Sequence, residues 1–224
     1  MMRVVIAGGH GKIALILERL LSERGDSAAG LIRNPAQVDD LEKAGAEALV
    51  VDLEGSSVEQ VATHLDGADA VVFAAGAGPG SGAARKETVD RDAAILLADA
   101  AEAAGVNRYL MISAMGADDQ TQDGGADPVF AAYLRAKAAA DKAIRAHTAL
   151  AATIVRPGLL TDDPGAGRVT IEDSTGRGSI PREDVAAVLV ALLDTPATGG
   201  QTFEVISGDT PIADAVAARA DRRD

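Results

Sequence analysis

Three residues along the chain have the side chains that a proton-transfer site needs. Tyr133 and Lys137 are four positions apart in a segment expected to be helical, so both project from the same helix face. Ser113 lies at the carboxyl end of a predicted strand over 108–113, the end at which open α/β sheets bind ligands. The Lys137 ammonium is expected to lower the pKa of the Tyr133 phenol, and the Ser113 hydroxyl to hold a substrate oxygen.

We therefore predict that these three residues are catalytic and that Tyr133 protonates a carbonyl oxygen. The alternative is that Tyr133 packs under the loop over 76–82 and that Lys137 is a solvated helix residue.

A glycine-rich turn near the N-terminus is typical of a dinucleotide-binding site. It follows an apolar, β-branched run over 4–6 that predicts a buried strand, and it opens a helix whose free N–H groups suit a pyrophosphate. Gly8 permits a sharp turn, Gly11 permits close approach to a phosphate, and Ala14 stands where a third glycine is common. The cofactor-binding residues expected in this turn are Gly8, Gly9, His10, Gly11, Lys12 and Ile13. The simpler alternative is a tight turn without a ligand.

The ends of later strands supply the other cofactor contacts that we expect. Arg33 follows the second strand, about 20 residues beyond the glycine turn, where an acidic residue would hold the ribose 2′-hydroxyl of NAD. A guanidinium there suits a 2′-phosphate instead, so we expect NADP (NADPH) and favour NAD less. A solvated surface arginine is the alternative. The remaining expected contacts are Asp52 and Leu53 at the adenine, Ala74, Ala75 and Gly76 along the cofactor, Ser113 and Lys137, and Pro157 and Gly158 at the nicotinamide.

Strands and helices alternate along the chain, which predicts an α/β fold: a three-layer, doubly wound parallel sheet. We expect one domain over 1–224, with substrate-side elements at about 159–180 and 200–224. Strands are expected over 27–32, 46–51, 70–75, 108–113, 152–155 and 202–206, with a short hairpin around 169–171. Helices are expected over 36–44, 57–65, 85–104, 129–147, 183–193 and 212–220. Loops are expected over 76–82 and 115–128.

Composition narrows the possible partners. Of the 224 residues, 47% are apolar but only 2% are aromatic, so the core must be built from Val, Ile, Leu and Ala. A net charge of −13 repels nucleic acid and anionic membranes, so we expect neither as a partner.

The chain has no cysteine and three scattered histidines, which predicts no disulfide and no metal site. The sequence has no signal pattern and no long apolar run, so we expect a cytoplasmic protein.

Taken together, these motifs resemble those of the atypical short-chain dehydrogenase/reductases, in particular the small, sugar-epimerase-like NAD(P)H-binding proteins. In chain order, the matching segments are 8–14, 31–34, 52–53, 74–78, 105–109, 112–114, 133–137, 154–158 and 180–185. The resemblance implies a Rossmann sheet, a preference for NADP through Arg33, and Ser113, Tyr133 and Lys137 at the catalytic positions. The sequence departs from the family pattern at Ala14, and no residue matches the upstream Asn of the family's catalytic tetrad.

We therefore expect an NADP-dependent oxidoreductase of the short-chain dehydrogenase/reductase type. Its substrate would be a small carbonyl, quinone-like or flavin compound, and it would be a monomer or homodimer. One alternative is a non-catalytic NADPH-binding redox sensor that reports to a partner. Another is an NAD(P)-dependent epimerase or dehydratase, although the short C-terminal part argues against a bulky nucleotide-sugar substrate.

Overall fold

The computed structural model describes residues 1–78, 80–118 and 127–222. Its strands are β1 (Arg3–Ala7), β2 (Ser27–Ile32), β3 (Ala46–Val50), β4 (Ala70–Phe73), β5 (Arg108–Ile112), β6 (Ala151–Pro157), β7 (Leu159–Thr161), β8 (Arg168–Glu172), β9 (Ser179–Pro181), β10 (Thr202–Ser207) and β11 (Thr210–Pro211). Its helices are α1 (Lys12–Glu23), α2 (Val38–Lys43), α3 (Val58–Thr63), α4 (Ala83–Arg85), α5 (Ala93–Ala103), α6 (Pro128–Ala146), α7 (Arg182–Leu193) and α8 (Ile212–Ala220). The other helical segments are the 3-10 helices η1 (Pro35–Gln37) and η4 (Pro196–Thr198) and the π-helix η2 (Lys86–Asp92).

The main sheet has the strand order β11-β8-β10-β6-β5-β4-β1-β2-β3. Neighbouring strands from β3 to β10 run parallel, whereas β8 is antiparallel to both β10 and β11. The chain first builds the sheet outward through β2 and β3, then returns to the other side of β1 with β4. This reversal is the point at which doubly wound sheets bind dinucleotides, and it confirms the predicted fold class.

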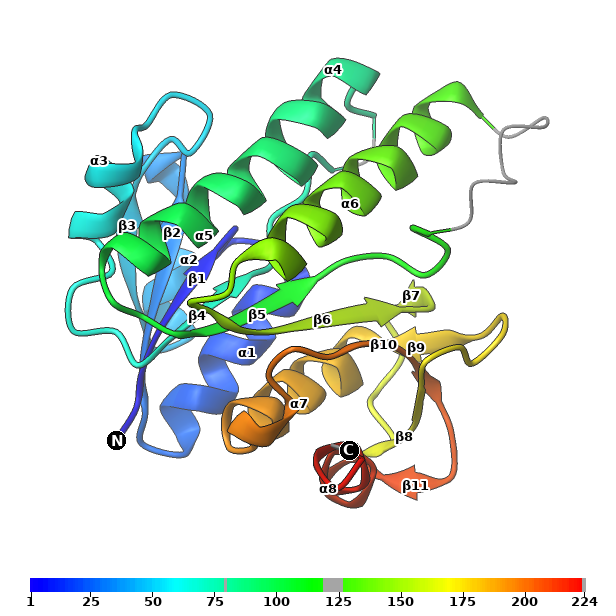
Figure 1. Ribbon diagram of the computed structural model, residues 1–224. Helices are drawn as coiled ribbons and strands as arrows, with labels where there is room; N and C mark the ends of the chain where they lie inside the picture. Colours follow the sequence, from blue (N-terminus) through cyan, green and yellow to red (C-terminus); the bar gives the residue numbers. More distant parts are fainter. Residues whose placement is uncertain (79, 119–126, 223–224) are drawn as a thin grey trace.

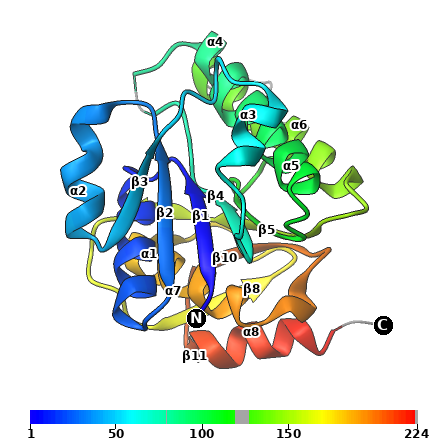
Figure 2. The same cartoon turned by 90° about the vertical axis from the view of Figure 1, so that its left-hand side faces the viewer.

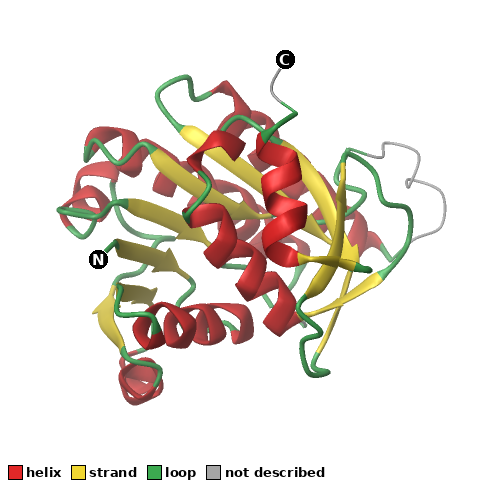
Figure 3. Ribbon diagram, turned by 90° about the horizontal axis from the view of Figure 1, so that it is seen from below, coloured by secondary structure: helices red, strands yellow, loops and turns green. Residues whose placement is uncertain are grey.

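Helices cover both faces of the sheet, as predicted (Figures 1 and 2). Alternate residues of β1 face opposite ways: Val4 and Ile6 belong to the core under α1 and α7, and Val5 and Ala7 to the core under α3 and α5. Seen from below, the helices of one layer lie in front of the strands (Figure 3). Within the described ranges, no helix has the length and apolar character needed to span a membrane.

The segment after β6 departs from expectation. The hairpin predicted around 169–171 is wrong: Val169 and Ile171 lie in β8, which adds to the main sheet by pairing with β10 and β11. A separate pair of parallel strands, β7 and β9, forms beside it. These pairings join residues far apart in the sequence, so local periodicity could not reveal them.

The two expected loops are described only in part. Pro79, in the loop over 76–82, and residues 119–126, in the loop over 115–128, lie outside the described residues. Pro128 is not in a loop but is the first residue of α6, and the Asp127 side chain caps this helix by accepting a hydrogen bond from Val129 N at 2.9 Å.

Candidate functional site

The glycine turn between β1 and α1 is packed so closely that side chains would not fit. Gly8 has a φ of +79°, and a Cβ there would lie 2.6 Å from Ala75 Cα. A Cβ on Gly9 would lie 2.7 Å from Gly30 Cα in β2. Gly11 is the N-cap of α1, and no side chain in the described part of the chain caps this helix, so its first N–H groups are available to an anion. The turn therefore fits the pyrophosphate of a dinucleotide.

The other residues of this turn have different surroundings. The His10 ring nitrogens lie 2.9 Å from Asp40 Oδ2 and 3.0 Å from Gln37 Nε2, which directs the ring toward η1 and α2. Ile13 is buried in the core, and so only its backbone can reach a ligand. Ala14, at the third-glycine position, is fully buried and packs α1 against the sheet.

Lys12 joins the glycine turn to the far side of the site. Its Nζ lies 2.5 Å from Asp162 Oδ2, and the other oxygen of Asp162 accepts from Arg182 Nη1 at 2.6 Å. Asp162 follows β7 and lies in the segment over 159–180 expected on the substrate side, whereas Arg182 begins α7 directly after that segment. The ion pairs hold this segment against the start of α1.

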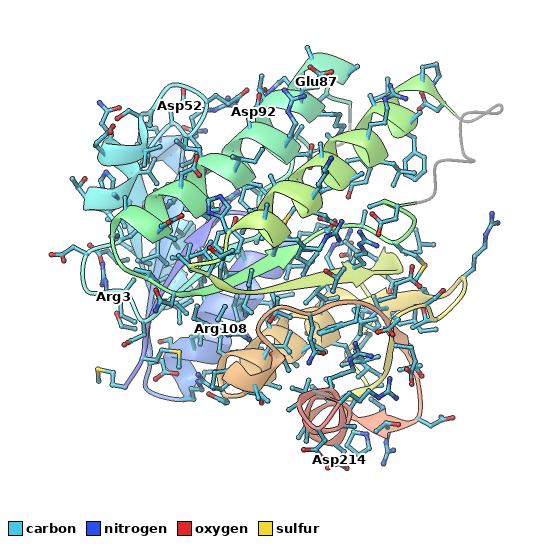
Figure 4. All side chains as sticks on the ribbon, in the orientation of Figure 1. Arg3, Asp52, Glu87, Asp92, Arg108 and Asp214 are labelled. Carbon is cyan, nitrogen blue, oxygen red and sulfur yellow. The ribbon has the colours of Figure 1, made fainter. Side chains whose placement is uncertain are left out.

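A pocket lies beside the glycine turn, at the carboxyl ends of β2 and β3. Arg33 and Glu54 line it from the segments that follow these strands, and Arg85 lines it from α4. Its other lining residues are Gly8, Leu31, Val51, Asp52, Leu53, Ala75, Val89 and Ala93. The structure thus brings the predicted residues Arg33, Asp52, Leu53 and Ala75 to one place. Figure 4 shows Asp52 on the same side of the molecule as Glu87 and Asp92, which lie on the helical segment after β4.

Lys137 is the best defined member of the predicted catalytic set. Its side chain is only 3% exposed, and its Nζ donates a hydrogen bond to Ile112 O at 3.2 Å, directly before Ser113. The same Nζ lies 5.8 Å from the centre of the Tyr133 ring. Burial lowers the pKa of Lys137, and the nearby Asp90 and Asp141 carboxylates act in the opposite direction. Tyr133 and Lys137 therefore share a helix face, as the spacing predicts.

Asp90 is a site residue that the sequence reasoning missed. It lies on η2 with its side chain 1% exposed, and its Oδ1 is 3.4 Å from Lys137 Nζ. Its Oδ2 accepts from Ala77 N at 3.2 Å, and a Cβ on Gly76 would lie 3.2 Å from Oδ1. The available signal was an acidic residue within the apolar stripe of the helix predicted over 85–104. π-helical turns such as η2 are often found at functional sites.

The surroundings of Tyr133 reverse one expectation. Burial raises the pKa of its phenol, and the Asp90 and Asp141 carboxylates raise it further. The predicted lowering by the Lys137 ammonium is therefore wrong, because burial is the largest effect on this phenol and both carboxylates act in the same direction. The phenol stays protonated at neutral pH, which suits a proton donor.

Ser113 lies between Lys137 and a buried ion pair. It is 2% exposed, and its Oγ has no hydrogen-bond partner of good geometry among the described residues. Burial raises the pKa of the neighbouring Asp141, while the Ser113 hydroxyl and Arg156 lower it. Arg156 donates to Asp141 Oδ2 at 2.9 and 2.7 Å and to Asp118 Oδ2 at 2.7 Å. The Ser113 hydroxyl is thus buried in a polar setting beside Asp141.

The remaining predicted residues lie at the ends of β4 and β6. Ala74 donates its N–H to Ala7 O at 3.0 Å, which places the segment over 74–76 between β1 and η2. Gly158 has a packing reason to be glycine, because a Cβ there would lie 2.4 Å from Gly178 O. Pro157 is buried at the end of β6.

Comparisons with known proteins show the family of this chain. A protein-family model described as NAD(P)H-binding matches residues 8–196. The uncharacterized sugar epimerase YhfK of Bacillus subtilis is 38% identical over 216 residues, which are 96% of this chain and 99% of that protein.

Two solved structures are also similar. One, provisionally named an NAD-dependent epimerase/dehydratase, comes from Bacillus halodurans: it is 38% identical with a TM-score of 0.89, over 97% of this chain and 100% of that one. The oxidoreductase ylbE from Lactococcus lactis is 27% identical with a TM-score of 0.85, over 97% of this chain and 96% of that one.

Proposed function

Because the chain belongs to the NAD(P)H-binding family, we propose that it is an NADPH-dependent reductase of the short-chain dehydrogenase/reductase type. Its substrate is a small carbonyl, quinone-like or flavin compound. One observation carries the proposal: the buried Asp90–Lys137 pair lies beside Tyr133, at the sheet edge that also bears the glycine turn. Carbonyl reduction requires a proton donor and a dinucleotide site next to each other.

The cofactor would lie across the carboxyl ends of the strands. The free N–H groups at the start of α1 suit its pyrophosphate, and Arg33 suits a 2′-phosphate, which favours NADPH over NADH. The other residues proposed to contact it are Gly8, Gly9, His10, Gly11, Lys12, Ile13, Asp52, Leu53, Ala74, Ala75, Gly76, Ser113, Lys137, Pro157 and Gly158.

When bound, the nicotinamide supplies the hydride. The Ser113 hydroxyl orients the substrate oxygen, and Tyr133 donates its phenolic proton to that oxygen. The raised pKa of Tyr133 keeps this proton in place until the oxygen becomes basic. Lys137, held by Asp90, faces the phenolate that remains and offsets its negative charge.

Replacing Tyr133 by Phe tests the proposal. NADPH consumption is followed with methylglyoxal, a naphthoquinone and FMN as substrates, and NADPH binding is measured by calorimetry. Loss of a positioned proton donor should cost roughly 100-fold or more in turnover, with binding preserved. The matched control is Tyr109→Phe. The Tyr109 hydroxyl donates to Ala94 O at 2.9 Å in the core and takes no part in the proposed proton transfer. Equal turnover in Tyr133→Phe and wild type would refute the proposed role.

An NAD(P)-dependent epimerase or dehydratase is the second candidate, since the Bacillus subtilis relative and the Bacillus halodurans structure carry names of that kind. Such an enzyme regenerates its cofactor within each cycle. Net NADPH oxidation in step with product therefore favours the reductase. Tight NADPH binding without turnover of any substrate would instead favour a redox sensor.

A further inference from the structure

Two arginines from different parts of the chain meet on one carboxylate oxygen. Arg33 Nη1 and Arg85 Nη2 each lie 2.8 Å from Oε2 of Glu54. The other oxygen of Glu54 accepts a hydrogen bond from the Thr88 hydroxyl at 2.6 Å. Arg33 follows β2, Glu54 follows β3, and Arg85 ends α4, so only the fold brings the three charges together.

This cluster is part of the pocket beside the glycine turn, whose lining includes Gly8, Arg33, Glu54 and Arg85. The two arginine side chains remain 55% and 42% exposed, so both guanidiniums are accessible to a ligand. Glu54 is more enclosed, at 25% exposed. A ligand in this pocket would meet the guanidiniums and the carboxylate at the same point.

The charges do not balance within the cluster. Two guanidiniums carry +2 and the shared carboxylate carries −1, so the cluster has a net charge of +1. A phosphomonoester carries roughly −1.5 to −2 at neutral pH and offers three acceptor oxygens, which matches two guanidiniums better than one carboxylate oxygen does. Arginine presents a rigid set of donors suited to this group.

We propose that Arg33 and Arg85 together form a clamp for the 2′-phosphate of an adenosine cofactor, and that Glu54 competes with this phosphate for both guanidiniums. This inference rests on the proposed function for the position of the adenosine. It adds Arg85 as a second phosphate ligand and Glu54 as the residue that limits selectivity. Glu54 can instead accept a hydrogen bond from an unmodified ribose 2′-hydroxyl, so the balance between the two sets the preference for NADP over NAD.

The test uses small probes that contain only the adenosine end. Binding of 2′,5′-ADP, 3′,5′-ADP and 5′-ADP is measured by calorimetry for wild type, Arg33→Gln, Arg85→Gln and Glu54→Gln, together with NADPH and NADH. The matched control is Arg91→Gln, because Arg91 lies on η2, directly after α4, and pairs with the exposed Asp92. Thermal unfolding of each variant reports any loss of folding.

We expect Arg85→Gln and Arg33→Gln each to weaken 2′,5′-ADP roughly 10-fold, as is typical for loss of a charge-assisted contact, and to leave 5′-ADP within about 2-fold. Glu54→Gln should tighten 2′,5′-ADP several-fold, because it removes the competing charge. Arg91→Gln should change neither probe.

Three results would overturn the inference. The first is equal weakening of 2′,5′-ADP and 5′-ADP by Arg85→Gln, which would make Arg85 a structural link. The second is an unchanged affinity for 2′,5′-ADP in Arg85→Gln. The third is a preference for 3′,5′-ADP, which would move the phosphate to the neighbouring hydroxyl.

The proposed function can fail separately. If 2′,5′-ADP binds in an Arg85-dependent manner but NADPH is not consumed with any substrate, the clamp stands and the reductase does not. If NADPH and NADH support turnover equally, and Arg85→Gln changes turnover with neither cofactor, the reductase stands and the clamp does not.

Discussion

Lys137 Nζ lies 3.4 Å from Asp90 Oδ1, and the two side chains are 3% and 1% exposed. They come from facing helical segments, α6 and η2. A buried ammonium without a counter-charge would lose its proton, and a buried carboxylate alone would gain one. The Asp90 carboxylate therefore opposes the loss of the Lys137 proton that burial favours, and the ammonium stays beside the Tyr133 ring.

Replacing Asp90 by Asn tests the effect of this pair on catalysis. Asp90 opposes the burial that lowers the pKa of Lys137, so its loss should lower that pKa further. The high-pH limb of the turnover profile should then move to lower pH, whereas loss of packing alone would reduce turnover equally at every pH. The variant should also lose about 3 kcal/mol of stability, because one member of a buried pair is removed.

Asp92→Asn is the matched control for Asp90→Asn. Asp92 lies on the same segment but is exposed and pairs with Arg91. Its replacement should leave both the pH profile and the stability close to those of wild type. An unshifted profile in Asp90→Asn would show that Asp90 does not govern the ionisation of Lys137.

Glu18 predicts a pH dependence of stability. Its side chain on α1 is fully buried, neither carboxyl oxygen has a hydrogen-bond partner among the described residues, and burial raises its pKa from 4.5 to about 8. The folded state holds this proton more tightly than the unfolded chain. The resulting stability is complete below pH 4.5 and is lost as the pH rises to about 8.

Glu18→Gln should remove this dependence. Relative to the variant, wild type should lose on the order of 3 kcal/mol between about pH 5 and pH 8.5 in urea unfolding. The control is Glu23→Gln, on the same helix, because Glu23 is exposed and pairs with Arg19. Parallel stability curves for wild type and Glu18→Gln would contradict the prediction.

Gly8→Ala tests whether the glycine turn needs its close packing. The substitution adds strain from a φ of +79° and a contact of 2.6 Å with Ala75 Cα. We expect a loss of more than about 2 kcal/mol of stability and at least ~10-fold weaker NADPH binding. Unfolding and calorimetry provide the two measurements.

Gly25→Ala separates strain from steric contact. Gly25 has a similar φ of +86°, but a Cβ there would meet no atom of the described residues within 4 Å. Gly25→Ala should lower the stability by only about 1 kcal/mol and should not affect NADPH binding. Similar effects of the two substitutions would mean that the approach of Ala75 to Gly8 is unimportant.

Much of the fold was predictable because its signals are local. The strand over 27–32 and the helix over 212–220 have the bounds expected from apolar periodicity and from turn residues. Tyr133 and Lys137 share a face because any helix places residues four apart in that way. The segment after β6 was not predictable, because β8 finds its partners β10 and β11 more than thirty residues later.

The sequence by itself determined the alternation of strands and helices, the glycine turn, and the presence of a tyrosine and a lysine on one helix face. Each of these depends on neighbours within a few residues. The tertiary structure alone decided that Asp90 pairs with Lys137, that Arg33 and Arg85 share Glu54, and that the phenol of Tyr133 holds its proton more tightly. These properties depend on burial and on charges from distant segments, and a linear sequence does not fix either until the chain has folded.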